Sequence, residues 1–289
     1  MILLFAESGT TKCQWTGIDA SHGEVLLDIY SKGLNPSMFS PDFIYSELNK
    51  LERLKPLIPE ISQVYFYGAG CGSPAGRQMM ESILQAFFVM ADEINVTDDM
   101  EAAVYACTRT PAVVGIIGTG SNACFYDGKI IQTKIPSLGF ILMDDGSGNH
   151  LGRLLLRSYY FGELDQRLMY SLENNFDLDP DNVKYRLYKE EGAATYLATF
   201  AEFVIENKVH PQMRKMIEKG FYSYIHTQLK PFKSELVKFP LHLVGSVSFL
   251  LQDVWKDIAL REGFQIGSFI KNPMEGLIKA RWKDQSGSI

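Results

Sequence analysis

Residues 2–18 read ILLFAESGTTKCQWTGI, and this stretch decides the fold. An apolar strand is followed by a turn at Ser8-Gly9 and then by a second strand, Cys13 to Ile18. The turn exposes backbone N–H groups and hydroxyls, and Lys12 adds a cation, so it has the chemistry to hold a phosphate group. A P-loop or a Rossmann fingerprint would instead run from such a turn into a helix. The second strand disfavours both of those folds and leaves a plain hairpin turn as the alternative.

The same order of elements returns in the middle of the chain. A third strand, Glu24 to Tyr30, completes the first meander, and strands then alternate with helices. A strand at Ala112 to Ile117, a turn at Gly118-Thr119-Gly120-Ser121 and strands at 123–126 and 129–135 repeat the pattern. The repeat predicts a mixed α/β protein with two lobes of related core. The two turns are either a phosphate clamp or a pair of structural hairpins, and the pattern alone does not separate these readings.

Apolar spacing predicts the remaining elements. They are a helix with apolar residues from Phe43 that continues until Pro56, a mainly helical region at 147–230, a strand at 241–244, a helix from about 246 to 262, and a terminal helix that starts near Pro273.

Length and composition restrict the class of protein. A chain of 289 residues suits two domains that each bury a core. The formal net charge of -6 argues against a broad basic surface, so we expect no nucleic acid partner. The sequence shows neither a signal peptide nor a window of about 18 uncharged apolar residues, so we expect a cytoplasmic protein that does not span a membrane.

The cysteines and histidines are predicted to carry no chemistry. The four cysteines lack CxxC spacing, so we interpret them as reduced residues, with Cys71 in a Gly-rich loop as the least typical of them. The five histidines lack the spacing of zinc ligands. An iron–sulfur cluster needs several closely arranged cysteines, so the sequence predicts none.

Two acidic segments each stand just before a predicted helix. Asp98-Asp99 follow a strand, and a carboxylate in that place can accept a proton from a substrate hydroxyl, as a general base must. The alternative role for Asp98 or Asp99 is to cap the helix. Asp144-Asp145 have the oxygen ligands that Mg2+ prefers, and capping is again the alternative for Asp145.

Eight short motifs in chain order carry a resemblance to a known family. They are Glu7-Ser8-Gly9-x-Thr11-Lys12, Gly33-Leu34-Asn35-Pro36, Gly68-Ala69-Gly70, Asp99 with Ala102-Ala103, Gly118-Thr119-Gly120-Ser121, Leu138-Gly139 with Asp144-Asp145-Gly146-Ser147-Gly148, Gly245-Ser246-Val247, and Pro273-x-x-Gly276-Leu277. Through them the chain resembles, over nearly its whole length, the N-acetylglucosamine kinase and BadF/BadG/BcrA/BcrD ATPase family.

The resemblance implies an actin-like ATPase fold, an α/β architecture of two ribonuclease H-like lobes with ATP and Mg2+ in an interlobe cleft. We expect the lobes at 1–107 and 108–271, and a terminal helix within 272–289 that packs on the first lobe. The implied site residues are Ser8, Gly9, Thr10, Thr11, Lys12, Gly118, Thr119, Gly120 and Ser121 for the phosphates, Gly245 and Ser246 for adenosine, Asn35, Asp99, Gly139, Asp144 and Asp145 for the sugar, and Glu7 for hydrated Mg2+.

The implied reaction transfers the γ-phosphoryl group of ATP to a hydroxyl of an amino sugar, with N-acetylglucosamine and its 6-hydroxyl as the expected substrate and Asp99 as the base. Whether two copies pair as a homodimer is left open. The chain departs from the family in two places, since Glu7 and Asp145 stand where the family generally has Asp and Glu. The change at Glu7 motivates one alternative, a nucleotide-binding sensor that has lost turnover. A further alternative is an ATPase that activates a partner enzyme, which the absence of cluster-binding cysteines disfavours.

Overall fold

The computed structural model describes residues 1–286, which divide into two compact units. Unit 1 comprises Met1–Arg109 and the C-terminal segment from Asn272, and unit 2 comprises Thr110–Lys271. The last three residues of the predicted terminal segment 272–289 lie outside the described residues. Along residues 1–286, no helix combines the length and the apolar character needed to cross a membrane.

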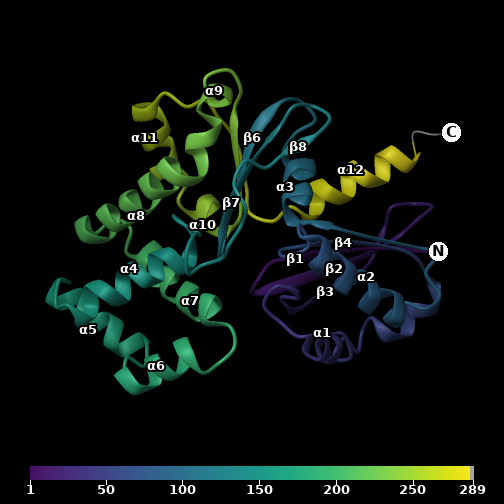
Figure 1. Cartoon of the computed structure of the whole chain (residues 1–289), viewed down its shortest axis with the longest axis horizontal. Helices are drawn as coiled ribbons and strands as arrows, with labels where there is room; N and C mark the ends of the chain where they lie inside the picture. The colour runs from purple at the N-terminus through teal and green to yellow at the C-terminus, as the bar shows by residue number, and fades with distance from the viewer. Residues whose placement is uncertain (287–289) are drawn as a thin grey trace. The chain divides into compact units, whose positions relative to one another are not determined.

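Unit 1 is a mixed sheet with helices on both faces (Figure 1). Its strands are β1 (Ile2–Ser8), β2 (Lys12–Asp19), β3 (Val25–Lys32), β4 (Ile61–Gly68) and β5 (Glu93–Asp98), and its helices are α1 (Pro41–Leu48), the short 3-10 helix η1 (Lys55–Glu60), α2 (Pro74–Phe87), α3 (Asp99–Cys107) and α12 (Met274–Ser286). The strand order is β3-β2-β1-β4-β5, with β1, β2 and β3 antiparallel and β1, β4 and β5 parallel.

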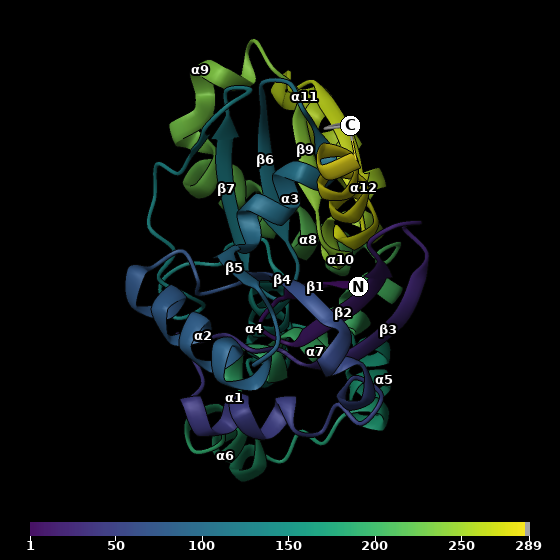
Figure 2. The ribbon, with the colours of Figure 1, turned by 90° about the vertical axis from the view of Figure 1, so that its right-hand side faces the viewer.

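The alternation of side chains along β1 divides the core of unit 1 between the two faces of the sheet. Leu4 and Ala6 belong to the cluster that includes residues of α1 and α2. Leu3 and Phe5 point to the opposite face, where they pack with Ala102 of α3 and residues of α12. Figure 2 shows α3 and α12 together, apart from α1 and α2. The segment from residue 272 therefore completes the first unit, although the whole of unit 2 precedes it in sequence.

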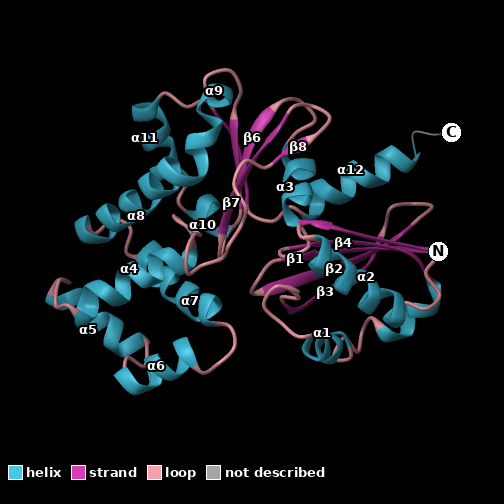
Figure 3. Cartoon of the chain, viewed as in Figure 1, coloured by secondary structure: helices cyan, strands magenta, loops and turns pink. Residues whose placement is uncertain are grey.

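Unit 2 repeats this sheet and adds a larger helical part (Figure 3). Its strands are β6 (Ala112–Ile117), β7 (Ser121–Tyr126), β8 (Ile131–Gln132), β9 (Leu241–Val244) and β10 (Ile266–Ile270). Its helical segments are α4 (Gly148–Tyr160), α5 (Gln166–Asn175), α6 (Pro180–Tyr188), α7 (Ala193–Glu206), α8 (Pro211–Tyr224), the π-helical turn η2 (Ile225–Leu229), the 3-10 turn η3 (Lys230–Phe232), α9 (Lys233–Leu236), α10 (Ser246–Leu250) and α11 (Gln252–Glu262). The strand order β10-β9-β6-β7-β8 is that of unit 1 read from the other end, so the predicted repeat is confirmed.

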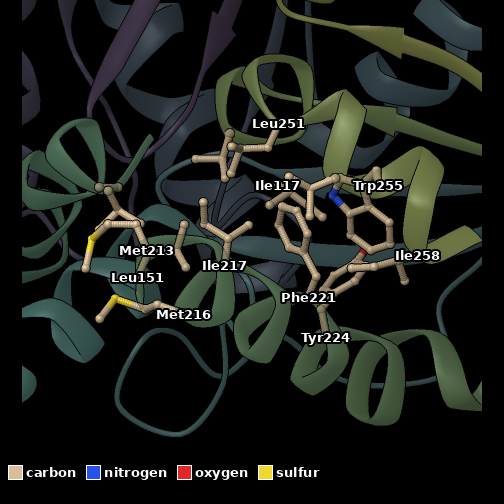
Figure 4. Packing of buried hydrophobic residues seen from close by; sticks show 14 of the residues in the cluster. Ile117, Leu151, Met213, Met216, Ile217, Phe221, Tyr224, Leu251, Trp255 and Ile258 are labelled. Carbon is tan, nitrogen blue, oxygen red and sulfur yellow. The ribbon is translucent and has the colours of Figure 1, made fainter. Parts of the chain in front are cut away.

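An aromatic group fixes α8 and α11 in the core of unit 2 (Figure 4). The Phe221 and Trp255 rings stack with centroids 4.5 Å apart, and the Tyr224 ring meets Trp255 edge-on at 5.9 Å. The Tyr224 hydroxyl donates a hydrogen bond of 2.8 Å to the backbone oxygen of Asn122 in β7. The core thus holds the strand that begins directly after the second Gly-rich turn.

Two predicted elements are wrong in extent. The helix expected to reach Pro56 ends at Leu48, because hydrogen bonds from Leu51 N to Leu48 O (3.1 Å) and from Leu54 N to Leu51 O (2.9 Å) form turns of three residues instead. These turns bury the same leucines that helical spacing would have buried. The strand expected at 129–135 is confined to Ile131–Gln132. Oδ1 of Asp127 accepts the backbone N–H groups of Lys129 and Ile130, each at 2.8 Å, so these two residues belong to the turn before the strand.

The region after β9 also differs from its prediction. The helix expected from about 246 to 262 is two helices, α10 and α11, which meet at Leu251. Strand β10 was not predicted, because Ile266–Ile270 contains Gly267 and Ser268 and none of its side chains is fully buried.

Candidate active site

The three parallel strands of unit 1 end side by side. β1 ends at Ser8, β4 at Gly68 and β5 at Asp98, and the register pairs Ser8 with Gly68 and Gly68 with Asp98. Ligands of open α/β sheets bind outside the carboxyl ends of the parallel strands. The first Gly-rich turn, the loop from Gly68 and the start of α3 follow these ends. Unit 1 therefore gathers three of the predicted motifs at one edge of its sheet.

The first Gly-rich turn is a tight hairpin pressed against the end of β3. The Gly9 N–H donates to the Lys12 carbonyl oxygen at 3.0 Å, and the Gly33 N–H donates to the Thr11 oxygen at 3.1 Å. A Cβ atom at Gly33 would lie 2.3 Å from the Gly9 oxygen and 2.4 Å from the Thr10 oxygen. Only glycine fits this approach of two backbones, so Gly33 fixes the shape of the hairpin.

Ser8 joins the hairpin to the segment that carries Asn35. Its side chain is buried, and its hydroxyl oxygen accepts the Leu34 N–H at 2.8 Å. The predicted phosphate residues Thr11 and Lys12 are exposed, and the Lys12 ammonium lies 5.5 Å from the centroid of the Tyr30 ring. The structure thus gives Ser8 an internal role and leaves Lys12 at the surface of the turn.

Asn35 is buried, with its amide in a defined orientation. The side-chain oxygen accepts the Ser37 N–H at 2.9 Å, so the amide nitrogen is the group left to donate to a ligand. A Cβ atom at Gly70 would lie 2.2 Å from that side-chain oxygen. The loop after β4 therefore packs directly against Asn35, and Gly70 is required for this contact.

The two aspartates at the end of β5 have separate roles. Asp98 caps α3, because its Oδ1 accepts the Met100 N–H at 3.0 Å, and a Cβ atom at Gly72 would lie 2.4 Å from its Oδ2. Asp99 is the first residue of the helix. Burial raises the pKa of the Asp99 carboxyl well above its usual range, and the charges of Asp98 and Glu7 raise it further. Asp99 is therefore a carboxyl group with a high proton affinity, as a general base requires.

Glu7 lies next to the first hairpin, on the face of the sheet that α3 and α12 cover. Alternation along β1 places it on the same face as Leu3 and Phe5. Burial raises the pKa of Glu7 to about 7, and the nearby charge of Lys12 limits the rise. Within residues 1–286, no group of three His, Cys, Asp or Glu side chains is arranged to hold a metal. Glu7 fits a Mg2+ ion bound through few protein oxygens together with phosphates, which is the usual Mg2+ arrangement.

The second Gly-rich turn, between β6 and β7, rests on the start of α4. The Gly118 N–H donates to the Gly120 oxygen at 3.0 Å, which closes the turn. The Gly118 oxygen accepts the Gly148 N–H at 2.8 Å. The Thr119 oxygen accepts both the backbone N–H of Asn149 at 3.0 Å and its side-chain amide at 2.7 Å. Sequence patterns did not single out Asn149, since an asparagine inside a predicted helix carries no recognisable signal.

Asp144 supports the same turn. Its Oδ1 accepts the Ser121 N–H at 3.1 Å, and its Oδ2 accepts the Asn149 amide at 3.1 Å. Its backbone has a φ of 64°, the left-handed region that aspartate tolerates better than most residues. Burial raises the pKa of Asp144, while these two hydrogen bonds lower it. The contacts of this carboxylate within unit 2 thus go to the turn and to the helix behind it.

Asp145 does not cap α4, because Ser147 does. Its Oδ2 accepts the Thr227 hydroxyl at 3.1 Å, and its side chain is 24% exposed. His150 lies 3.6 Å from Asp145 and accepts the Gly146 N–H through Nδ1 at 2.8 Å. This bond requires a neutral imidazole, and burial lowers the pKa of His150 accordingly. The prediction of no chemistry for the histidines did not foresee this support of the loop.

Gly245 packs against the end of β6 next to the second turn, and Gly139 lies in the loop before α4. Gly245 has a φ of 115°, and a Cβ atom there would lie 2.4 Å from the Ile117 oxygen at the end of β6. Ser246 follows as the first residue of α10. Gly139 has a φ of 77° with open space around it, and its oxygen accepts the Met143 N–H at 2.8 Å.

Comparison with solved structures identifies relatives of the whole chain. No family model matches it. A protein from Porphyromonas gingivalis named "Putative N-acetylglucosamine Kinase" is 30% identical, with 98% of this chain and 99% of that chain covered and a TM-score of 0.89. A protein of the same name from Chromobacterium violaceum is 15% identical, with 96% of this chain and 98% of that chain covered and a TM-score of 0.72. A ROK family glucokinase from Streptomyces griseus, in complex with glucose and AMPPNP, is 13% identical, with 97% and 98% covered and a TM-score of 0.57.

The second and third of these proteins share the fold, and the first is similar enough in sequence to show kinship. The predicted α/β fold of two actin-like ATPase lobes is confirmed by these structures and by the repeated sheets. At 30% identity over 98% of its length, the chain belongs to the N-acetylglucosamine kinase and BadF/BadG/BcrA/BcrD ATPase family.

Proposed function

We propose that the protein transfers the γ-phosphoryl group of ATP to a hydroxyl of an amino sugar, with the 6-hydroxyl of N-acetylglucosamine as the acceptor. Kinship with a protein named as a kinase of this sugar supports the proposal. The glucokinase complex with glucose and AMPPNP supports sugar and nucleotide binding as properties that this fold can carry.

The environment of the Asp99 carboxyl group is the observation that carries the proposal. A carboxyl group with a strongly raised pKa, at the carboxyl end of a parallel strand, has the features expected of a base for a sugar hydroxyl. Asn35 and the loop at Gly70 pack together and would position the sugar, with the Asn35 amide as a donor. Gly139 and Asp145 would add sugar contacts from unit 2, and so would Asp144 where its lone pairs remain available.

The two Gly-rich turns would bind the nucleotide. Thr10, Thr11 and Lys12 would contact phosphates from unit 1, and the turn at 118–121 would do so from unit 2. Gly245 and Ser246 would contact adenosine, because small residues let a ligand approach the backbone. Bound ATP would supply the phosphoryl group, and Mg2+ held through Glu7 would offset the charge of the phosphates.

Glu7 also supports a second candidate, a nucleotide-dependent sensor with little turnover. Its side chain is one methylene longer than the aspartate that the family generally has, and phosphoryl transfer depends on close positioning. In this candidate the nucleotide binds but no sugar stimulates ADP release. A Glu7→Asp variant that gains turnover would locate the defect at this residue.

The proposal is tested by ADP release with Mg-ATP against N-acetylglucosamine, glucosamine, N-acetylmannosamine and glucose. We expect one amino sugar to stimulate release and Asp99→Asn to lower kcat by about 100-fold or more. Asp92→Asn, the same change at an exposed position of unit 1, serves as the control and should match the wild type. Nucleotide binding without stimulation by any sugar would reject the kinase and leave the sensor.

A further inference from the structure

One side chain of the C-terminal helix contacts both strand β4 and helix α3, which begins with Asp99. Arg281, in α12, donates through Nε to the Tyr67 hydroxyl oxygen at 2.8 Å and through Nη2 to Oε1 of Glu101 at 2.8 Å. Its guanidinium also lies over the Tyr105 ring, 4.6 Å from the centroid. The side chains of Arg281 and Glu101 are 31% and 24% exposed, so the ion pair is partly shielded from solvent.

The partners of Arg281 lie directly behind the candidate active site. Tyr67 is the next-to-last residue of β4, and the strand register pairs it with Glu7 on one side and with Thr97 on the other. Glu101 is in the first turn of α3, two residues after Asp99. Arg281 thus joins the end of β4 to the turn of helix that begins with Asp99.

The docking of α12 does not depend on Arg281. Met274 and Leu277 are buried in the core that also contains Phe5. A Cβ atom at Gly276 would lie 2.8 Å from the Cα of Ala106, so α12 and α3 are in close backbone contact there. Apolar packing therefore holds the helix in place, and the paired donors of Arg281 are available to set the orientation of α3.

Three acidic residues stand at the start of α3. Asp98, Asp99 and Glu101 lie within four residues. Among the described residues, Arg281 is the cation that forms an ion pair with one of them, Glu101. A planar guanidinium can bond two acceptors at fixed angles, whereas a lysine ammonium is a single point charge. Arginine is therefore suited to hold Tyr67 and Glu101 at once.

We propose that Arg281 is a positioning residue for Asp99, and that the C-terminal helix is through it a functional part of the active site. The inference rests on the proposed function in that Asp99 is taken as the base. Arg281 touches neither substrate nor nucleotide in this scheme. It acts by holding α3 against β4 through Glu101 and Tyr67.

The first test compares the steady-state kinetics of Arg281→Met, Arg281→Lys and a control, Lys279→Met. Lys279 is on the same helix, exposed, and paired with Glu275. Because a small displacement of a catalytic group is costly, Arg281→Met should lower kcat about tenfold or more, with KM for ATP changed by less than about twofold. Arg281→Lys should recover part of the loss, and Lys279→Met should match the wild type. If Arg281→Met lowers Tm but leaves kcat unchanged well below the unfolding temperature, Arg281 is only a structural brace and the inference fails.

A second measurement separates this inference from the proposed function. Hydrogen exchange of the α3 backbone amides is followed in the same variants without any substrate. Faster exchange in Arg281→Met than in Lys279→Met supports the positioning role, and equal exchange overturns it. If the wild type shows no sugar-dependent ADP release, the proposed function fails, and the exchange result still decides whether Arg281 holds α3.

Discussion

Replacement of Asp144 tests whether its carboxylate supports the second Gly-rich turn. The carboxylate accepts hydrogen bonds from the Ser121 N–H and the Asn149 amide. Loss of one partner from a buried hydrogen bond costs roughly 1–3 kcal/mol, so Asp144→Gly should lower the free energy of unfolding by about 2–6 kcal/mol. Asp144→Ala should cost about 1 kcal/mol more, because alanine disfavours the φ of 64° that glycine accepts. Asp144→Asn keeps the shape but turns an NH2 group toward one donor, which should cost about 1–3 kcal/mol.

Urea denaturation of the three variants measures these differences. The expected order of stability is wild type, then Asn, then Gly, then Ala at position 144. The same variants should raise KM for ATP more than KM for the sugar, because the turn that they loosen is the predicted phosphate site. The reasoning is refuted if Asp144→Ala is as stable as Asp144→Gly, or if KM for the sugar rises while KM for ATP does not. The second result would show that Asp144 acts mainly on sugar binding.

Three further predictions concern single residues. The pKa of Glu7 is raised from 4.5 to about 7, so between these two pH values the folded state keeps a proton that the unfolded state has lost. This proton adds about 3 kcal/mol to the free energy of unfolding below pH 4.5, and the gain disappears as the pH rises to 7. Without Mg2+, the free energy of unfolding of Glu7→Gln relative to that of the wild type should therefore be higher at pH 8 than at pH 5. An equal difference at the two pH values would contradict this. Gly245→Ala should cost at least about 2 kcal/mol in thermal denaturation, whereas Gly162→Ala, with a positive φ but open space, should cost about 1 kcal/mol, and similar losses would exclude the clash with Ile117. Gly33→Ala should disorder the first hairpin and weaken ATP binding in calorimetry, and wild-type affinity would show that the close contact with Gly9 is dispensable.

The repeated hairpins could be predicted because their signal is local. An apolar strand, a turn with Gly and a second strand lie within about 15 residues in both units, and periodicity detects such segments well. The prediction of a helix that reaches Pro56 failed because it also relied on local spacing. Leu48, Leu51 and Leu54 are three residues apart, and this spacing fits a helix and a series of turns equally well. Periodicity reports which residues are buried, and it does not report which backbone hydrogen bonds bury them.

The candidate site was only partly predictable, because its support comes from residues distant in sequence. Gly33 appeared in a motif, but nothing in the sequence tells that its Cα faces the Gly9 oxygen. The choice between Asp98 and Asp99 as helix cap also needed coordinates, since either aspartate can fill that position. Asn149 and Arg281 carry no sequence signal at all, and their roles follow from hydrogen bonds that the fold creates.

The two units hold their hairpins by different chemistry, although their sheets repeat. In unit 1 a neutral hydroxyl, that of Ser8, bonds one backbone N–H, and the close approach of Gly33 sets the shape. In unit 2 a buried carboxylate, that of Asp144, bonds one backbone N–H and the Asn149 amide. A hydroxyl does not titrate near neutral pH, whereas a buried carboxylate loses its charge as the pH falls through its raised pKa. Acid should therefore weaken the turn of unit 2 before that of unit 1, because only the turn of unit 2 depends on a carboxylate.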